Sequence, residues 1–177
     1  MIVLDVVRVR AATDADVDSI CRICAEGWRD TYAGLRSDDE IEDVISRFYS
    51  AERVRRELGP LGEEWGGWFV AETEVGEVVA AGAGGLTTPI TGEVFVLYVD
   101  PSHQREGAGS AVLRALTAQQ LAHDAREQWV SVEQGNVRAI PFYEHHGFTL
   151  AGKRAAHEMS GSSLRYVRKL TPVQKAN

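Results

Sequence analysis

Two glycines carry the clearest chemical signal in this sequence. Gly107 and Gly109 lie in the run Gln104-Arg-Glu-Gly-Ala-Gly109, between an apolar segment and a segment rich in Ala and Leu. A glycine loop between a strand and a helix lets backbone N–H groups approach a ligand, and the positive end of the helix dipole favours a negative charge there. The pattern therefore predicts a site for an anion such as a pyrophosphate, with a structural turn as the alternative.

Two other phosphate-binding motifs do not fit this chain. A P-loop needs a lysine directly after its second glycine, and the first lysine in the sequence is Lys153. A dinucleotide-binding fingerprint needs Gly-x-Gly-x-x-Gly, but its last position is Val112 when counted from Gly107 and Thr87 when counted from Gly82. The sequence therefore argues against nucleotide triphosphate hydrolysis and against a Rossmann-type site.

A second motif follows the glycine loop. It reads Asn136-Val-Arg-Ala139-Ile-Pro-Phe142-Tyr143, followed by Gly147-Phe148. The two motifs together resemble those of the GNAT superfamily of acetyl-CoA-dependent N-acyltransferases, in which a Gln/Arg-x-x-Gly-x-Gly/Ala loop precedes an Asn-x-x-Ala-x-x-Phe/Leu-Tyr segment. The specific likeness lies in residues 93–148, and the order of elements extends it over residues 7–170.

The resemblance implies a site for coenzyme A. The amides of the glycine loop would hold the pyrophosphate, and the strand edge at residues 97–99 would pair with the pantetheine amides. Asn136 would contact the pantetheine arm, and Tyr143 would lie beside the sulfur. The residues that the resemblance assigns to the coenzyme are Leu97, Tyr98, Val99, Gln104, Arg105, Gly107, Ala108, Gly109, Ser110, Asn136 and Tyr143.

Acetyl transfer to an amine needs a proton acceptor and a proton donor. An amine like that of lysine has a pKa of ~10.4, so forming its free base at pH 7 costs about 4.6 kcal/mol. Glu93 and Glu133 are the candidate acceptors, with Glu93 favoured and a solvated strand-end carboxylate as the alternative for each. Tyr143, protonated at neutral pH, is the candidate donor to the leaving thiolate, with a phenol packed on the sheet as the alternative. An amide near Tyr98 or Val99 would meet the oxyanion.

The acceptor site is expected on the first two helices. Trp28 and Tyr32, together with Glu93, are the candidate substrate-binding residues, because Trp28-x-x-x-Tyr32-x-Gly34 resembles bacterial family members that acetylate polyamines and similar amines. The acidic run at residues 38–43 would attract a cation, with a solvated helix face around a core tryptophan as the alternative.

These observations favour an acetyl-CoA-dependent N-acetyltransferase that acts on a small cationic primary amine by direct transfer in a ternary complex. A catalytically silent acyl-CoA-binding or regulatory domain is one alternative, and acetylation of a protein N-terminus or lysine is another. No metal is expected, because Cys21 and Cys24 are two ligands without a partner pair and are interpreted as core residues of a helix.

Composition limits the partners. The chain has 177 residues with 19 Lys and Arg against 26 Asp and Glu, a net charge of −7, and this charge argues against nucleic acid or an anionic membrane as a partner. The length predicts one domain over residues 1–177, with a core at about 7–170 and a tail at 171–177. Two cysteines, no basic leader and no apolar run of ~20 residues predict a cytoplasmic protein. Dimers are common in the family that the chain resembles.

The elements that position these residues follow from hydrophobic periodicity and capping signals. Helices are expected to start at Thr13 and at Ser37, to span Gly109–Arg126, and to run from the N-cap Asn136 to about His146, where His145 and His146 complement the helix dipole. Pro141 is expected to bend the last of these helices, at a cost of roughly 3 kcal/mol if it lies in mid-helix. The expected strands are 7–10, 68–73, 78–86, 93–99, 129–133, 148–154 and 164–170.

The element order βααβββαβαββ predicts an α/β fold with helices on both faces of a mixed sheet. The apolar run of strand 93–99 suggests burial on both faces. The resemblance implies a mostly antiparallel sheet of about seven strands. It also implies a bulge in strand 93–99 and a V-shaped gap between the fourth and fifth strands.

Overall fold

The computed structural model describes residues 7–155 and 162–172. The N-terminal residues 1–6 and most of the predicted tail lie outside this part. In chain order the elements are β1 (Arg8–Ala11), the short 3-10 helix η1 (Asp14–Asp16), α1 (Val17–Tyr32), α2 (Asp38–Phe48), α3 (Ala51–Arg56), β2 (Trp68–Glu72), β3 (Val78–Thr88), β4 (Thr91–Val99), the 3-10 helix η2 (Pro101–His103), α4 (Ala108–Ala122), β5 (Glu127–Glu133), α5 (Ala139–His145), β6 (Thr149–Ala155) and β7 (Ser162–Lys169).

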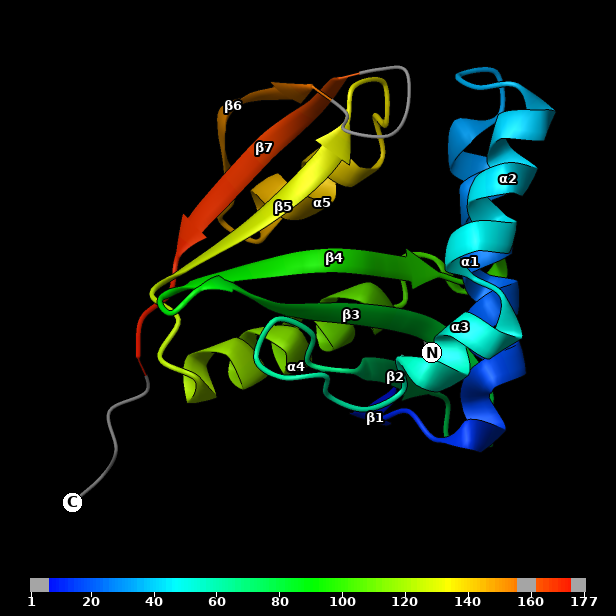
Figure 1. Ribbon diagram of the computed structural model, residues 1–177, viewed down its shortest axis with the longest axis horizontal. Helices are drawn as coiled ribbons and strands as arrows, with labels where there is room; N and C mark the ends of the chain where they lie inside the picture. The colour runs from blue at the N-terminus through cyan, green and yellow to red at the C-terminus, as the bar shows by residue number, and fades with distance from the viewer. Residues whose placement is uncertain (1–6, 156–161, 173–177) are drawn as a thin grey trace, which may run out of the picture.

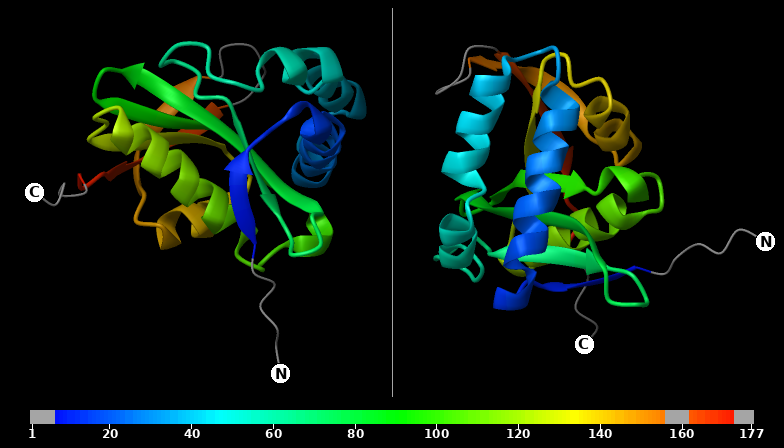
Figure 2. Two further views of the ribbon diagram at one scale, coloured as in Figure 1. Left: turned by 90° about the horizontal axis from the view of Figure 1, so that it is seen from below. Right: turned by 90° about the vertical axis from the view of Figure 1, so that its right-hand side faces the viewer.

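The strands form one seven-stranded sheet in the order β1-β2-β3-β4-β5-β7-β6 (Figure 1). Every neighbouring pair is antiparallel except β4 and β5, which run parallel. Helix α4 covers one face of the sheet, and α1 lies on the other (Figure 2). Neighbouring residues of β2 show the two faces, since Ala71 packs in the cluster that includes α4 and Val70 packs in the cluster that includes α1. The predicted fold class is confirmed.

The parallel pairing of β4 with β5 is short. It joins residues 91–94 to residues 127–130 and then stops. At the same point β4 bulges, because Ala83 pairs with Val96 while Gly84 pairs with Val94, so that Phe95 lies between two partners. The two strands diverge beyond this point, and the gap opens toward α1 and α2 (Figure 1). The bulge and the V-shaped gap are therefore present as predicted.

Buried amides stabilise the closed end of this gap. The side chain of Gln120 on α4 donates to the backbone carbonyl of Glu93 at 2.9 Å, and Gln128 on β5 donates to Gln120 Oε1 at 2.9 Å. Arg168 on β7 extends the network, with Nε donating to Gln128 Oε1 at 3.0 Å and Nη1 donating to the carbonyl of His146 at 2.8 Å. Each buried polar group of this network has a hydrogen-bond partner. The network can therefore form inside the core without leaving an unsatisfied donor or acceptor there.

Helix α1 lies unusually close to β4. A Cβ atom added to Gly27 would lie 2.4 Å from Cδ1 of Tyr98, which is too short for any real contact. The predicted apolar face of this helix is buried, with Val17, Ile20 and Cys24 less than 2% exposed. Glycine at position 27 thus lets the helix backbone rest against an aromatic ring of the strand.

Several predicted boundaries of helices are wrong. Helix α4 ends at Ala122 rather than at Arg126, and α3 was not predicted because a helix of only six residues carries little periodicity. The fourth predicted helix, α5, begins at Ala139 instead of directly after Asn136. Asn136 still acts as a local cap, since its Oδ1 accepts a hydrogen bond from the amide of Ala139 at 3.2 Å.

The predicted bend at Pro141 is also wrong. Because α5 starts at Ala139, Pro141 occupies the first turn of the helix, where backbone N–H groups have no intrahelical partner and a proline removes nothing. The expectation that strand 93–99 is buried on both faces fails as well. Phe95 is 42% exposed, since the bulge turns it out of the sheet.

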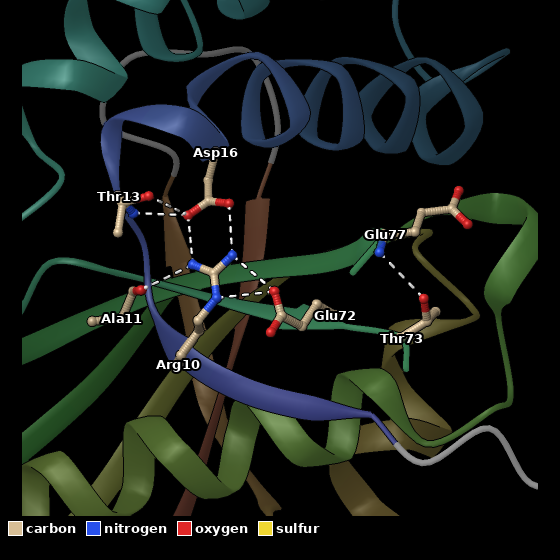
Figure 3. A network of polar contacts seen from close by, with 7 residues as sticks. All are labelled: Arg10, Ala11, Thr13, Asp16, Glu72, Thr73 and Glu77. Carbon is tan, nitrogen blue, oxygen red and sulfur yellow. Dashed lines mark hydrogen bonds and ion pairs between the residues drawn. The ribbon is translucent and has the colours of Figure 1, made fainter. Parts of the chain in front are cut away.

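An ion-pair network holds the N-terminal strand to the start of α1 (Figure 3). The guanidinium of Arg10 donates to both oxygens of Asp16, at 2.7 and 2.9 Å, and its Nε donates to Glu72 at 3.0 Å. Asp16 also accepts a hydrogen bond from the amide of Thr13 at 2.8 Å and so forms a capping box with Thr13, where a helix start was expected. The hydrogen bond from Arg10 is the main reason that the pKa of Asp16 lies below its ordinary value of 3.8.

Replacing Asp16 with Asn should lower the free energy of unfolding by about 2 kcal/mol at pH 7, because Arg10 loses a buried charged partner. A carboxyl whose pKa is lower in the folded state stabilises the protein above the pKa of the unfolded state and loses that contribution as pH falls. Urea unfolding should therefore show the wild type and Asp16→Asn converging as the pH is lowered below about 4. Asp14→Asn, at an exposed carboxylate, is the control and should change stability by less than ~1 kcal/mol; an equal loss for both variants would contradict the role of Asp16.

Candidate active site

A cavity of about 750 Å³ lies in the gap between β4 and β5. Its walls are the second half of β4, the turn before α4, helix α5 with the loop that precedes it, and one face of α1. The structure brings together in this cavity every residue that was assigned to the coenzyme: Leu97, Tyr98, Val99, Gln104, Arg105, Gly107, Ala108, Gly109, Ser110, Asn136 and Tyr143.

The two glycines of the loop have different structural roles. Gly107 adopts a left-handed conformation with φ +87° and is the N-cap of α4, so the cap position has no side chain to satisfy the first amides of the helix. Gly109 instead permits close packing, because a Cβ there would lie 3.2 Å from Cγ2 of Val99 on β4. The start of α4 therefore presents unsatisfied N–H groups and the positive end of its dipole to the cavity.

The hydroxyl of Tyr143 is a proton donor at neutral pH. The residue is 7% exposed, and its ring packs edge-on against Phe142 and Phe148. Burial raises the pKa of this phenol well above its ordinary value of 10. Its hydroxyl forms no hydrogen bond with any residue that the structure describes, so it remains available to a ligand in the cavity.

The two predicted proton acceptors lie apart from the residues that line the cavity. Glu93 is held by the guanidinium of Arg165, with oxygen to nitrogen distances of 2.5 and 3.2 Å. Glu133 forms an ion pair with Arg36, whose side chain is 3% exposed. In each pair the guanidinium of an arginine donates to the carboxylate of the glutamate. This arrangement therefore does not favour direct proton transfer to either glutamate.

The predicted substrate-binding aromatics belong to a small core between α1 and α2. Trp28 and Tyr32 are 6% and 7% exposed, with ring centroids 4.2 Å apart, and the indole of Trp28 donates to the hydroxyl of Tyr49 at 3.2 Å. Burial raises the pKa of Tyr32 to about 12, and its hydroxyl interacts with that of Tyr98, which does line the cavity. Trp28 therefore packs in the core between α1 and α2 and does not line the cavity.

The acidic run on α2 is largely engaged by neighbouring cations or by the cap of its own helix. Glu42 pairs with Arg29, and Asp43 pairs with Arg47. Glu40 closes the predicted capping box with Ser37. None of the residues in this run lines the cavity.

Sequence reasoning missed one wall of the cavity. Gly27, Asp30 and Thr31 lie at positions i, i+3 and i+4 on one face of α1, and all three line the cavity. An ion pair joins Asp30 to Arg138 in the loop before α5. The helical spacing could have placed the three α1 residues together, but no motif marks them. The other lining residues that were not predicted as site residues are Val137, Arg138, Ala139, Pro141, Phe142, His145 and His146.

His146 connects the two helices that border the cavity. Its Nε2 lies 2.8 Å from the hydroxyl of Ser110 in the first turn of α4. Burial is the main cause that lowers the pKa of His146 below its ordinary value of 6.5. His146 is predicted to complement the helix dipole, and its contact with Ser110 also fixes α5 against the glycine loop.

These features, a splayed mixed sheet with a glycine loop and a buried tyrosine facing one cavity, define an acyltransferase architecture. Residues 27–148 match the acetyltransferase (GNAT) family, which is more than half of the chain. The chain belongs to this family. The predicted enzyme class is confirmed, as is the predicted acyl donor, acetyl-CoA.

Individual relatives agree with this assignment. The chain is 28% identical over 145 residues to the uncharacterized N-acetyltransferase YuaI of Bacillus subtilis, with 78% of each chain covered. It is 24% identical over 150 residues to a spermidine N(1)-acetyltransferase of Thermoplasma acidophilum, covering 80% of this chain and 88% of the relative. The crystal structure of the PaiA N-acetyltransferase of Thermoplasma acidophilum in complex with coenzyme A has a TM-score of 0.79 at 20% identity, covering 93% of this chain and 99% of that one.

Replacing Gly107 with Val should abolish the rise in melting temperature that acetyl-CoA causes in the wild type through preferential binding to the folded state. The reason is that φ +87° is strained for a β-branched residue, by about 1–3 kcal/mol, and that the added side chain lies at the mouth of the anion site. The measurement is a thermal shift titration with acetyl-CoA.

Gly76→Val is the matched control. Gly76 has φ +82° and an equally open surrounding, but it lies in the turn between β2 and β3, away from the cavity. It should lose similar stability and keep the acetyl-CoA shift. A full shift in Gly107→Val would show that the loop does not hold the coenzyme.

Proposed function

We propose that this acetyltransferase moves an acetyl group from acetyl-CoA directly to a primary amine of a small cationic molecule, with both substrates bound together. The observation that carries the proposal is the position of Tyr143. This protonated phenol faces the same cavity as the free amides of the glycine loop. A site that binds a diphosphate at one end and offers a proton at the other is suited to thioester chemistry.

The chain provides three sets of groups for the coenzyme. The amides of residues 107–110 and the guanidinium of Arg105 would bind the phosphates. The edge of β4 beyond Val94 has no partner on β5, so its backbone groups are available to the pantetheine amides. Asn136 would contact the pantetheine arm, although its Oδ1 is already engaged by the amide of Ala139; its side-chain NH2 remains a donor.

Proton transfer is the chemical contribution of the protein. The reaction forms a C–N bond and breaks the C–S bond of the thioester, so the nitrogen must lose a proton and the sulfur must gain one. Tyr143 would protonate the departing sulfur, because its phenol stays protonated at neutral pH and the residue lines the cavity. An amide of Tyr98 or Val99 would stabilise the oxyanion. Glu93 and Glu133 would receive the ammonium proton only through intervening water, since arginines hold their oxygens.

Two observations support a cationic amine as the acceptor. One of the relatives is a spermidine N(1)-acetyltransferase that matches 80% of this chain. The net charge of −7 also favours the approach of a cation over that of a polyanion such as RNA. Release of the coenzyme thiol with a panel of polyamines, monoamines and N-terminal peptides tests the acceptor class, and activity restricted to peptides would contradict it.

Replacing Tyr143 with Phe should lower kcat by about 100-fold and leave the acetyl-CoA thermal shift unchanged, because the ring remains and only the proton donor is lost. Steady-state kinetics of thiol release measures this. Tyr166→Phe is the matched control, because Tyr166 on β7 belongs to the same hydrophobic core at 3% exposure but does not line the cavity. An unchanged kcat in Tyr143→Phe would reduce the tyrosine to a packing residue and favour a different acid.

A further inference from the structure

Asp30 is the one carboxylate among the described residues that line the cavity. Besides the phenols of Tyr98 and Tyr143, the other titratable side chains of the lining are basic: Arg105, Arg138, His145 and His146. Basic groups are suited to bind the phosphates of a coenzyme, but the carboxylate of Asp30 is not. The single carboxylate, which α1 contributes, is instead suited to a ligand group of positive charge.

The present partner of Asp30 is easily exchanged. Its carboxylate pairs with Nη1 of Arg138, and the two side chains are 38% and 63% exposed. An ion pair between exposed, flexible side chains contributes little to stability. A ligand ammonium could therefore take the place of the guanidinium without disturbing the fold, and the carboxylate would keep a cationic partner throughout.

Other acids near the gap cannot take this role. Glu93 is bound through both oxygens by Arg165, which also donates to Ser131 at 2.6 Å. Glu133 pairs with an arginine whose side chain is 3% exposed. Both pairs are more buried than that of Asp30, and breaking a buried pair leaves an uncompensated charge. The exposed pair is the one that a ligand can open.

We propose that Asp30 binds a second cationic group of the acceptor, in exchange for Arg138, and so makes the enzyme selective for amines that carry two charges. This inference rests on the proposed function and names the residue that recognises its substrate. The group bound by Asp30 is an ammonium that does not react. A carboxylate beside the reacting nitrogen would raise the pKa of its ammonium and oppose the loss of the proton.

The experiment compares a linear diamine with a monoamine of the same chain length, using thiol release and acetyl-CoA at saturation. Asp30→Asn should raise KM for the diamine by about 10-fold or more, leave its kcat within about 3-fold, and change neither constant for the monoamine by more than about 3-fold. The acetyl-CoA thermal shift should stay as in the wild type. Asp30→Glu, which keeps the charge, should retain part of the preference for the diamine.

Asp39→Asn is the matched control. It changes the net charge by the same amount, but Asp39 is exposed on α2 and does not line the cavity. It should leave KM for the diamine unchanged. An equal rise in KM for both variants would mean that general electrostatic attraction, and not a contact at Asp30, selects the substrate, and would overturn the proposal.

Arg138→Gln tests the exchange itself. Removing the competing guanidinium should lower KM for the diamine by about 2-fold to 5-fold in the wild-type background and have no effect in the Asp30→Asn background. The same effect in both backgrounds would contradict an exchange at Asp30.

A binding measurement separates this proposal from the proposed function. If no amine causes thiol release in the wild type, the proposed acetyl transfer to amines fails. Calorimetric titration of the diamine into protein saturated with coenzyme A still tests Asp30, since the wild type should bind the diamine about 10-fold more tightly than Asp30→Asn. Equal affinities in this titration would overturn the role of Asp30 independently of catalysis.

Discussion

The structure depends on the early end of the parallel pairing between β4 and β5. Only residues 91–94 of β4 pair with β5, and the bulge at Phe95 turns the rest of the strand away. The divergence creates the cavity and frees a strand edge. Because β5 leads directly into the loop and helix that carry Asn136 and Tyr143, it also determines where these residues face. A longer ladder between β4 and β5 would close the cavity.

The closed end of the gap is held by polar side chains rather than by further strand pairing. Gln120, Gln128 and Arg168 link α4, β5 and β7 to the carbonyl groups of Glu93 and His146. On the opposite side of the sheet, Arg165 crosses from β7 to Glu93 on β4. A sheet with only four parallel pairs at its centre thus gains cross-links that resist further separation.

Local signals in the sequence were sufficient for most of the fold and for the residues that line the cavity from β4, α4 and α5. The cap at Ser37 and the glycines at 107 and 109 act within a few residues, so the sequence spacing predicts them. The ion pairs of the carboxylates depend on contacts between distant residues, since Asp30 and Arg138 are 108 positions apart and Glu93 and Arg165 are 72 positions apart. The periodicity of the sequence does not indicate such distant pairs. The roles expected of Glu93 and Trp28 therefore fit the structure less well than the role expected of Gly107.

The close approach at Gly27 has a consequence for the range of molecules that such an enzyme can accommodate. The absent side chain sets the spacing between α1 and the ring of Tyr98, and this helix also carries Asp30. Position 27 therefore sets the width of the cavity at α1, because the Cβ of even an alanine would clash with the ring of Tyr98 and displace the helix outward, while the start of α4 would stay in place. Engineering for bulkier nucleophiles would begin there, at a residue that performs no chemistry.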